Sequence, residues 1–345
     1  MIKMIKPILN KLKQPLTLIS LLLFCYSCES DKPKNISFYH WKSRAEFSAE
    51  IEQTLNESHS KKIYMHYFDI EPVKNQTYYD DGIYPTYVIK DIDPSYSDFE
   101  IVPVIYITNQ VFKTENIDIE KLVNQIKGLI HQISLKYFEK EITSIQIDCD
   151  WTQSTKNAYF ELLNLLQEYF EIDVTIRLHQ IKYKEKTGVP PVKHGTLMLY
   201  NMGDFKNNDE NSILESSIVQ QYIDNTTNYP ISLHLGLPIF SQTILTNNDN
   251  EYKIIKDTDR HLYETDKHFE AVNHNNFKII KDTLYKGFYL TSGFNLKLEE
   301  INQNEIIKSY QIIEKSKLNI DEIILYHLDE KSISNIDIKT LINEL

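Results

Sequence analysis

A nine-residue stretch in the middle of the chain constrains the fold more than any other segment. Residues 144–152 alternate strictly between polar and apolar side chains, which is the two-residue period of a β-strand. One face carries Gln146, Asp148, Asp150 and Thr152, and the other carries Ile145, Ile147, Cys149 and Trp151. Long helical patterns flank the stretch on both sides, so we expect a buried parallel strand.

Two carboxylates on one face of a buried strand are costly unless each has a partner, a metal or access to water. A closed (β/α)8 barrel meets this need. The apolar face then packs on the outer helices, and the polar face points into the barrel near its C-terminal mouth, where active sites lie. We therefore predict the α/β class and a (β/α)8 TIM barrel.

The rest of the chain alternates between strand and helix patterns at the spacing of such a barrel. Strands are expected at 36–41, 62–69, 101–112, 144–152, 173–181, 195–202, 229–238 and 322–328, and helices at 44–58, 118–140, 155–170, 212–223, 303–315 and 336–345. Residues 72–98 form a long loop rich in Tyr and Asp, with a strand-like part at 86–90. Residues 240–300 exceed the length of a barrel loop, so we expect a subdomain inserted between the seventh and eighth strands. With only 8 Gly and no low-complexity run, one domain over residues 36–345 is favoured.

The first 28 residues have the pattern of a targeting segment. A lysine-rich start precedes the short apolar run Leu16–Phe24, which is too short to span a bilayer. Ser27-Cys28 follows and resembles a bacterial lipobox. We expect a lipoprotein signal peptide that ends at a lipidated Cys28, a polar tether over residues 29–35, and a lipid anchor on the outer membrane of a Gram-negative cell envelope. A plain signal peptide or an uncleaved anchor is the alternative.

The charge balance excludes one class of partner. The chain has 49 acidic and 37 basic residues, a net charge of −12, so we do not expect a general nucleic-acid binder. Membrane contact is expected through the lipid anchor only. With Cys28 acylated and Cys149 inside a strand, no internal disulfide is expected. Cys149 as a nucleophile is the alternative to core packing, which its helix-facing register favours.

Several strands place polar residues at inward positions near their C-terminal ends. Beyond the two aspartates they are His66, Asp69 and Glu71 from the second strand, Arg177 and His179 from the fifth, Tyr200 and Asn201 from the sixth, His234 from the seventh, and Tyr326, His327 and Asp329 from the eighth. Each alone is explained by a satisfied polar core group, but together they predict one pocket in the mouth. We expect one cavity lined by Asp148, Asp150, Arg177, Tyr200 and His327, with Arg177 paired to one of the aspartates.

Three motifs resemble one family. Asp148-Cys149-Asp150-Trp151 is similar to the fourth-strand Asp-x-Asp-Trp of the chitinase-like family 18 glycoside hydrolases. Met198–Asn201 resembles that family's sixth-strand Met-x-Tyr-Asp, and Leu235–Phe240 resembles its seventh-strand Leu-Gly-Ile-Pro-Phe-Tyr. The chain also looks like a family of bacterial chitinase-like barrel lipoproteins. The resemblance implies a barrel over residues 36–345, an insertion after the seventh strand, and a substrate-facing Asp150.

The chain departs from the family pattern at the positions of the family's catalytic residues. Thr152 occupies the position of the glutamate that is the general acid in active chitinases, and Asn201 replaces the sixth-strand aspartate. The third strand lacks the usual Ser-Gly-Gly. The resemblance therefore does not imply substrate-assisted hydrolysis of an N-acetylated sugar.

Three functions remain open. In the first, an envelope lipoprotein hydrolyses a glycan with other carboxylates: Asp150 as nucleophile or base, Asp329 or Glu71 as acid, and Asp148 or Asp69 as further candidates. His66, His179 and His327 would transfer protons or, with the other mouth residues, orient the substrate. In the second, the barrel binds a glycan without turnover, and Trp41, Trp151, Tyr200 and Tyr326 stack on sugar faces.

The third is a metal-dependent hydrolase. Asp148, Asp150, His66, His179, His234 and His327 are suitable ligand types, but no short His-x-x-His spacing supports such a site. We therefore assign no metal ligand and expect no cofactor; the expected partner is a glycan or oligosaccharide.

Overall fold

The computed structural model describes residues 35–74, 82–205, 210–256, 258 and 260–345. The chain divides into two units, Met1–Lys34 and Asn35–Leu345, and the second is the one described here. The predicted signal peptide, the lipidation site Cys28 and the tether up to residue 34 lie outside the described residues, so those expectations remain predictions. None of the helices in the described ranges combines the length and apolar character needed to cross a bilayer.

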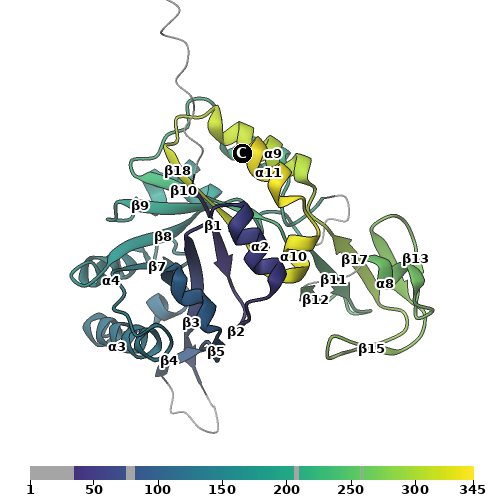
Figure 1. Ribbon diagram of the computed structural model, residues 1–345, viewed down its shortest axis with the longest axis horizontal. Coiled ribbons are helices and arrows are strands. Elements are labelled where there is room, and N and C mark those ends of the chain that lie inside the picture. Colours follow the sequence, from purple (N-terminus) through teal and green to yellow (C-terminus); the bar gives the residue numbers. More distant parts are fainter. Residues whose placement is uncertain (1–34, 75–81, 206–209, 257, 259) are drawn as a thin grey trace, which may run out of the picture. The chain divides into compact units, whose positions relative to one another are not determined.

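Eight parallel strands close into a barrel (Figure 1). In spatial order they are β1 (Asn35–His40), β18 (Ile320–Tyr326), β10 (Ser232–Pro238), β9 (His194–Met198), β8 (Glu171–Arg177), β7 (Ser144–Asp148), β6 (Glu100–Ile107) and β3 (Lys62–Val73). Pairing of β1 with β3 closes the ring. The predicted α/β class and (β/α)8 barrel are confirmed, and all eight strands overlap the ranges expected from the sequence.

Helices lie between most successive barrel strands, and two more follow the last strand. They are α2 (Ala49–Glu57), α3 (Ile119–Phe138), α4 (Lys156–Leu166), α5 (Leu178–Lys182), α6 (Lys184–Thr187), α7 (Ser216–Tyr222), α9 (Gln303–Glu314), α10 (Glu330–Ser334) and α11 (Ile338–Glu344). The longest, α3, begins at Asp118, whose side chain accepts a hydrogen bond from the Lys121 backbone N–H. Such capping satisfies an amide that would otherwise lack a partner at the helix start.

Two strand ends differ from the sequence expectation. The fourth strand ends at Asp148, so Asp150 and Thr152 lie in the loop that follows it. The fifth ends at Arg177, and His179 belongs to α5 rather than to the strand. At this point the Arg177 backbone N–H donates to Gln180 Oε1 at 2.7 Å, which turns the chain into a helix although the polar–apolar alternation continues.

The segment between β3 and β6 is folded rather than a plain loop. Its described part contains β4 (Gly82–Thr86), which pairs antiparallel with β3, then β5 (Asp91–Ile92), which pairs with β2 (Arg44–Ala45). Two 3-10 turns, η2 (Pro94–Asp98) and η3 (Val111–Lys113), flank β6. β4 extends the barrel sheet beyond β3.

A subdomain is inserted between β10 and β18, as predicted. It holds β11 (Gln242–Thr246), β12 (Tyr252–Lys256), α8 (Arg260–Thr265), β13 (Phe269–Ala271), β14 (Asn276–Ile279), β15 (Thr283–Tyr285), β16 (Phe288–Leu290) and β17 (Asn295–Glu299). Five of its strands form a sheet in the order β12-β11-β17-β14-β13 (Figure 1). Tyr263, Phe277 and Leu296 lie in its own small core.

The insertion is tied to the barrel by a buried polar cluster. Glu299, at the end of β17, accepts hydrogen bonds from the Ser212 backbone N–H at 3.0 Å and from Gln242 Nε2 at 2.9 Å. Lys297 Nζ lies 2.8 Å from the same carboxylate. Ser212 belongs to the loop after β9, so this cluster fixes the insertion to the C-terminal side of the barrel.

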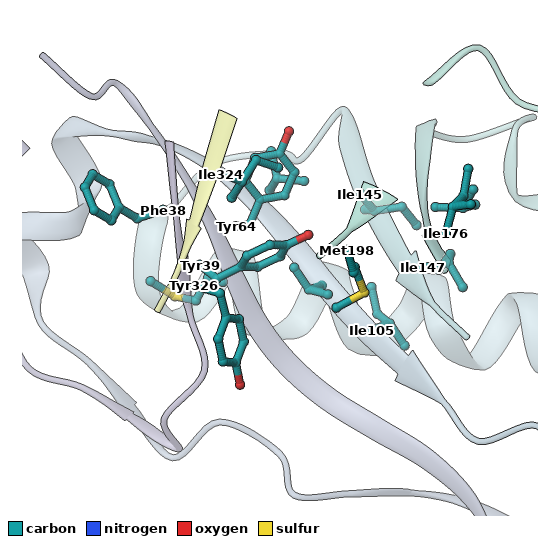
Figure 2. Packing of buried hydrophobic residues seen from close by; sticks show 14 of the residues in the cluster. Phe38, Tyr39, Tyr64, Ile105, Ile145, Ile147, Ile176, Met198, Ile324 and Tyr326 are labelled. Atoms are coloured by element: carbon teal, nitrogen blue, oxygen red, sulfur yellow. The ribbon is translucent and has the colours of Figure 1, made fainter. Parts of the chain in front are cut away.

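The barrel core has an apolar outer layer and a polar, aromatic interior. Ile145, Ile147 and Ile176 are fully buried on the outward faces of β7 and β8. Inside, the Tyr39 hydroxyl donates to Gln146 Oε1 at 2.8 Å. Figure 2 shows Tyr39 together with Tyr64 and Tyr326 beside β18. The alternation in residues 144–148 therefore has the predicted orientation.

Candidate functional site

A cleft of about 660 Å³ opens at the C-terminal ends of the barrel strands. Its walls come from the ends of β8, β9 and β18, from the segments that follow β7, β8, β9 and β10, from α7, and from β11 and β12 of the insertion. The lining residues are Asp150, Trp151, Thr152, Arg177, Leu178, His179, Met198, Tyr200, Asn201, Met202, Phe205, Tyr222, Phe240, Gln242, Ile254, Lys256 and Tyr326. Its location is the one used by ligand sites in this fold.

An ion pair crosses the cleft wall between the loop after β7 and the end of β8. Arg177 Nε donates to Asp150 Oδ1 at 2.7 Å, and Nη2 lies 3.5 Å from Oδ2. The Asp150 side chain is 49% exposed and that of Arg177 is 22% exposed. Burial opposes the charge of Arg177, but Asp150 and Asp148 outweigh it and raise the Arg177 pKa. The pair is thus charged and accessible from the cleft.

Asp148 lies behind this pair and does not line the cleft. It is 4% exposed, and Thr175 Oγ1 donates to its Oδ1 at 2.6 Å. Burial raises the pKa of Asp148, and the opposing effects of Arg177 and Thr175 do not cancel it. Tyr106 stands opposite Asp148 in the β6–β7 register, and burial beside the two aspartates raises its pKa to about 12.

The hydroxyl of Thr152 contacts other hydroxyl groups. It lies 3.0 Å from Ser154 Oγ and 3.2 Å from Thr155 Oγ1, within a small hydroxyl cluster at the start of α4. The neighbouring Trp151 is fully buried and stacks on Tyr159 of α4 with ring centroids 5.3 Å apart. Trp151 therefore packs mainly in the core and only borders the cleft.

The cleft floor is aromatic. The rings of Tyr200 and Tyr326 stack with centroids 4.8 Å apart, and Phe240 meets both rings edge-on. In the described part of the chain the buried Tyr200 hydroxyl has no hydrogen-bond partner. Asn201, next in sequence, has a positive φ of 54° and lies at the cleft rim. The floor offers flat apolar faces next to polar groups, a combination that suits sugars.

His327 and Asp329, which follow the eighth strand, form a separate cluster. Asp329 is 3% exposed, caps α10 by accepting from the Lys331 and Ser332 backbone N–H groups, and lies 2.8 Å from His327 Nε2. Lys42 Nζ lies 3.5 Å away. Burial acts against the Asp329 charge, but the contacts with His327, Ser332 and Lys42 prevail and lower its pKa. Neither Asp329 nor His327 lines the cleft, so this part of the expected cavity is not formed.

The second-strand candidates also lie apart from the cleft lining. His66 Nε2 is 2.6 Å from Asp69 Oδ1, and the His66 ring stacks on Trp41 at 4.5 Å. Glu71 lies farther along β3, where it pairs with Tyr84 of β4. Asp69 pairs with Tyr106 of β6, which in turn pairs with Asp148 of β7, so Asp69 lies two strands away from the strand that leads to Asp150.

His234 lies at the opposite end of the barrel from the cleft. It is the third residue of β10, and its Nδ1 lies 2.8 Å from Asp173 near the start of β8. Burial opposes its protonation, but Asp173, Glu322 and Asp321 outweigh that effect and raise its pKa. The expectation that His234 reaches the mouth is not met, because inward register does not fix depth in the barrel.

The structure also brings in residues that the sequence reasoning did not select. Thr175 and Tyr106 surround Asp148, and Gln242, Ile254 and Lys256 come from the insertion. Thr175 precedes Arg177 by two positions on β8, so strand alternation alone was a sufficient signal for it. The insertion residues carry no such signal, because their contact with the mouth depends on how that sheet packs.

Comparison with known proteins gives similarity at the level of solved structures only. No family model matches the chain, and no curated protein matches it. Similar structures include the spore cortex-lytic enzyme SleL of Bacillus cereus, with 10% identity, TM-score 0.44, and 90% of this chain and 74% of that one covered. A chitinase of Rhizomucor miehei has 9% identity and a TM-score of 0.43, with 90% of this chain and 99% of that one covered. The ChiA C-terminal domain of Legionella pneumophila has 9% identity and a TM-score of 0.43, with 90% of this chain and 97% of that one covered. At these values the likeness bears on neither substrate nor catalysis.

Proposed function

We propose that this barrel binds a glycan in the cleft without hydrolysing it. The observation that carries the proposal is the number of carboxylates in the cleft lining and the contacts they make. Among the described residues, Asp150 is the sole carboxylate that lines the cleft, and it is paired with Arg177. Glycoside hydrolysis needs two carboxyl groups that flank the scissile bond, about 5–5.5 Å apart for retention and roughly 6.5–9.5 Å for inversion.

Three other candidate carboxylates have contacts of their own or are buried. Asp329 is committed to the cap of α10, Asp69 to His66, and Asp148 is buried behind the cleft wall. Thr152, at the position where active chitinases carry their acid, has a hydroxyl that does not supply a proton to a leaving sugar at neutral pH. Binding remains possible because it requires none of these proton transfers.

The cleft has the components of a sugar-binding surface. Tyr200, Tyr326 and Phe240 provide the aromatic floor, and the Asp150–Arg177 pair offers both acceptors and donors at the rim. Burial lowers the pKa of His179, so its ring is neutral at pH 7 and can both donate and accept. Sugars present hydroxyls and flat C–H faces, which match these two kinds of group.

A hydrolase remains the second candidate, because burial raises the pKa of Asp148 in the vicinity of Asp150. A carboxyl with a raised pKa next to an ionised one is the usual division between acid and base. In that case Asp148 would have to reach the glycosidic oxygen after substrate binding, within about 2.6–3.2 Å. Release of reducing ends separates the two candidates.

The lipid anchor belongs to the same proposal: Cys28 is acylated and holds the barrel on the envelope. Its support is the lysine-rich start, the apolar run and Ser27-Cys28 in the sequence. Palmitate labelling of the wild type and of Cys28→Ala tests it. We expect the variant to lose the label, and equal labelling of both proteins would contradict the anchor.

The binding proposal is tested with residues 29–345 on a glycan array and polysaccharide pull-down, followed by a reducing-end assay on every hit. We expect saturable binding and no reducing ends. Asp150→Asn should lower affinity by about 10-fold or more, since it removes the charge that Arg177 faces. Thr152→Ala is the matched control on the same loop and should be mild. Full binding by Asp150→Asn would place the glycan elsewhere, and reducing ends from the wild type would identify a hydrolase.

A further inference from the structure

Three potential metal ligands meet at the N-terminal end of the barrel, opposite the cleft. They are His194 at the start of β9, His234 on β10 and Asp321 on β18, which are adjacent strands in the sheet. Their ligand atoms all lie within 4.8 Å of one another. Asp321 Oδ2 is 3.6 Å from His194 Nδ1, and Oδ1 is 3.4 Å from His234 Nε2.

These separations suit a shared cation better than direct hydrogen bonds. Normal N–H···O bonds have donor–acceptor distances of about 2.7–3.2 Å, shorter than both contacts. Zinc binds imidazole nitrogen and carboxylate oxygen at about 2.0–2.2 Å in a tetrahedron, which places neighbouring ligand atoms about 3.3–3.6 Å apart. Each imidazole nitrogen is close to that distance from one oxygen of the Asp321 carboxylate, Oδ2 for His194 and Oδ1 for His234, so a small rotation of the carboxylate brings a single oxygen within reach of both.

A β-bulge aims the carboxylate at the two imidazoles. In the β10–β18 register Leu233 pairs with Ile320 and His234 with Glu322, which leaves Asp321 as an extra residue between the two pairs. Successive strand residues normally point to opposite faces. Here Asp321 and Glu322 both approach His234 Nε2, at 3.4 and 3.8 Å. Bulges commonly re-aim a side chain in this way.

The buried neighbours of His234 prepare its outward nitrogen for a metal. Asp173 Oδ2 lies 2.8 Å from His234 Nδ1, and Oδ1 of the same carboxylate accepts hydrogen bonds from Gln146 and Thr196. When Nδ1–H donates to a carboxylate, Nε2 presents its lone pair, the arrangement found behind most metal-bound histidines. Glu322 is already engaged by Lys62 at 3.0 Å and by Ser37, which leaves Asp321 as the carboxylate available for an ion.

We propose that His194, His234 and Asp321 bind one divalent zinc-type cation that joins the starts of β9, β10 and β18. Two of the ligands are 40–47% exposed, so an ion can enter from solvent and a water molecule can fill the fourth position. At this end of a (β/α)8 barrel the expected role is stability rather than catalysis. The site is independent of the proposed glycan cleft.

The test measures zinc binding by calorimetry and Co²⁺ binding by visible absorption on the tag-free, full-length chain. Cys25 and Cys28 are replaced by serine in all samples, so that their thiols cannot bind the metal. We expect one equivalent of metal and an intense d–d band of tetrahedral Co²⁺. His194→Asn and Asp321→Asn should each weaken binding at least 10-fold, and glycan binding should not change.

His131→Asn is the matched control, because His131 Nδ1 lies 3.3 Å from Glu141 in an exposed pair for which the described residues offer no third ligand. It should leave the affinity unchanged. Absence of stoichiometric binding, full binding by both His194→Asn and Asp321→Asn, or an equal loss in the control would overturn the site. If one of the two variants does not fold, the metal affinity of the other decides the test. If neither variant folds, the Co²⁺ spectrum of the wild type decides it, and a spectrum of octahedral type refutes the proposal.

Discussion

The hydrogen bond from Thr175 to Asp148 gives the sharpest test of how the cleft wall is held. Thr175 is 2% exposed and Asp148 is 4% exposed, and their oxygens are 2.6 Å apart. Thr175 Oγ1 also accepts from the Cys149 backbone N–H at 3.3 Å. Thr175→Val replaces the hydroxyl by a methyl group of similar size, so it removes both bonds and leaves the two former partners without this hydroxyl.

The expected cost follows from these two bonds. A hydrogen bond to a charged group contributes about 1.5–3 kcal/mol, and an ordinary one about 1 kcal/mol. We therefore expect Thr175→Val to lower the free energy of unfolding by roughly 2–4 kcal/mol at pH 7. Burial already raises the pKa of Asp148, while Thr175 lowers it, so the variant should raise this pKa further.

The sign of the pH dependence is fixed by that shift. A carboxyl with a raised pKa in the folded state takes up a proton more readily than in the unfolded chain. The contribution of Asp148 to stability is therefore greatest below the usual aspartate range and falls as pH rises through the folded-state pKa. Because Thr175→Val raises that pKa, its cost should be largest at neutral pH and should shrink when Asp148 is protonated.

Urea unfolding followed by tryptophan fluorescence at several pH values measures these quantities. Thr243→Val is the matched control: Thr243 is also fully buried, but within the described residues its hydroxyl has no hydrogen-bond partner. The control should change the free energy of unfolding by less than about 0.5 kcal/mol. If both variants lose equal stability, or the loss in Thr175→Val does not depend on pH, the bond does not have the proposed role.

Three further outcomes are expected. Asp329→Asn should lower the free energy of unfolding by about 1–3 kcal/mol at pH 7 and leave glycan binding intact. The pKa of Asp329 is lowered in the folded state. The stability that Asp329 contributes is therefore present above the usual aspartate range and is lost as pH falls through the folded-state pKa. Gly195→Ala places a Cβ 2.5 Å from Ile176 Cδ1 and should lower the free energy of unfolding in urea by about 1–3 kcal/mol. The new Cβ of Gly128→Ala on α3 has no atom within 4 Å, so this variant should raise the free energy of unfolding by about 0.5–1 kcal/mol. Thr152→Glu should release no reducing ends from chitin oligosaccharides, since a new acid does not restore the aspartate that Asn201 replaces.

The fold was predictable because a barrel strand carries its orientation in its own sequence. Each of the eight strands alternates between an outer face that packs on helices and an inner face, and the helical periods between them set the order. The position of each strand end was less predictable. Beyond Arg177 the alternation continues to His179, but the hydrogen bond from the Arg177 N–H to Gln180 starts a helix there. A local capping contact thus overrides a longer-range pattern.

The candidate site was predictable only in part, since alternation gives the face of a side chain and not its depth. Asp150, Arg177 and Tyr200 meet in the cleft because they follow or end their strands. His234 has the same inward register but comes third in β10, so it lies near the opposite end. The contribution of Gln242 and Lys256 depends on tertiary packing of the insertion, which no local pattern encodes.

Depth along the strands also explains how one barrel interior holds so many charged groups. At the N-terminal end, Asp173 contacts His234 and Glu322 forms an ion pair with Lys62, and both carboxylates are buried. At the C-terminal end, the Arg177–Asp150 pair remains open to the cleft. A buried pair that loses one member leaves an uncompensated charge, whereas an exposed pair exchanges its partner for water or ligand at little cost. The same residue types therefore hold the barrel together at one end and are available for recognition at the other.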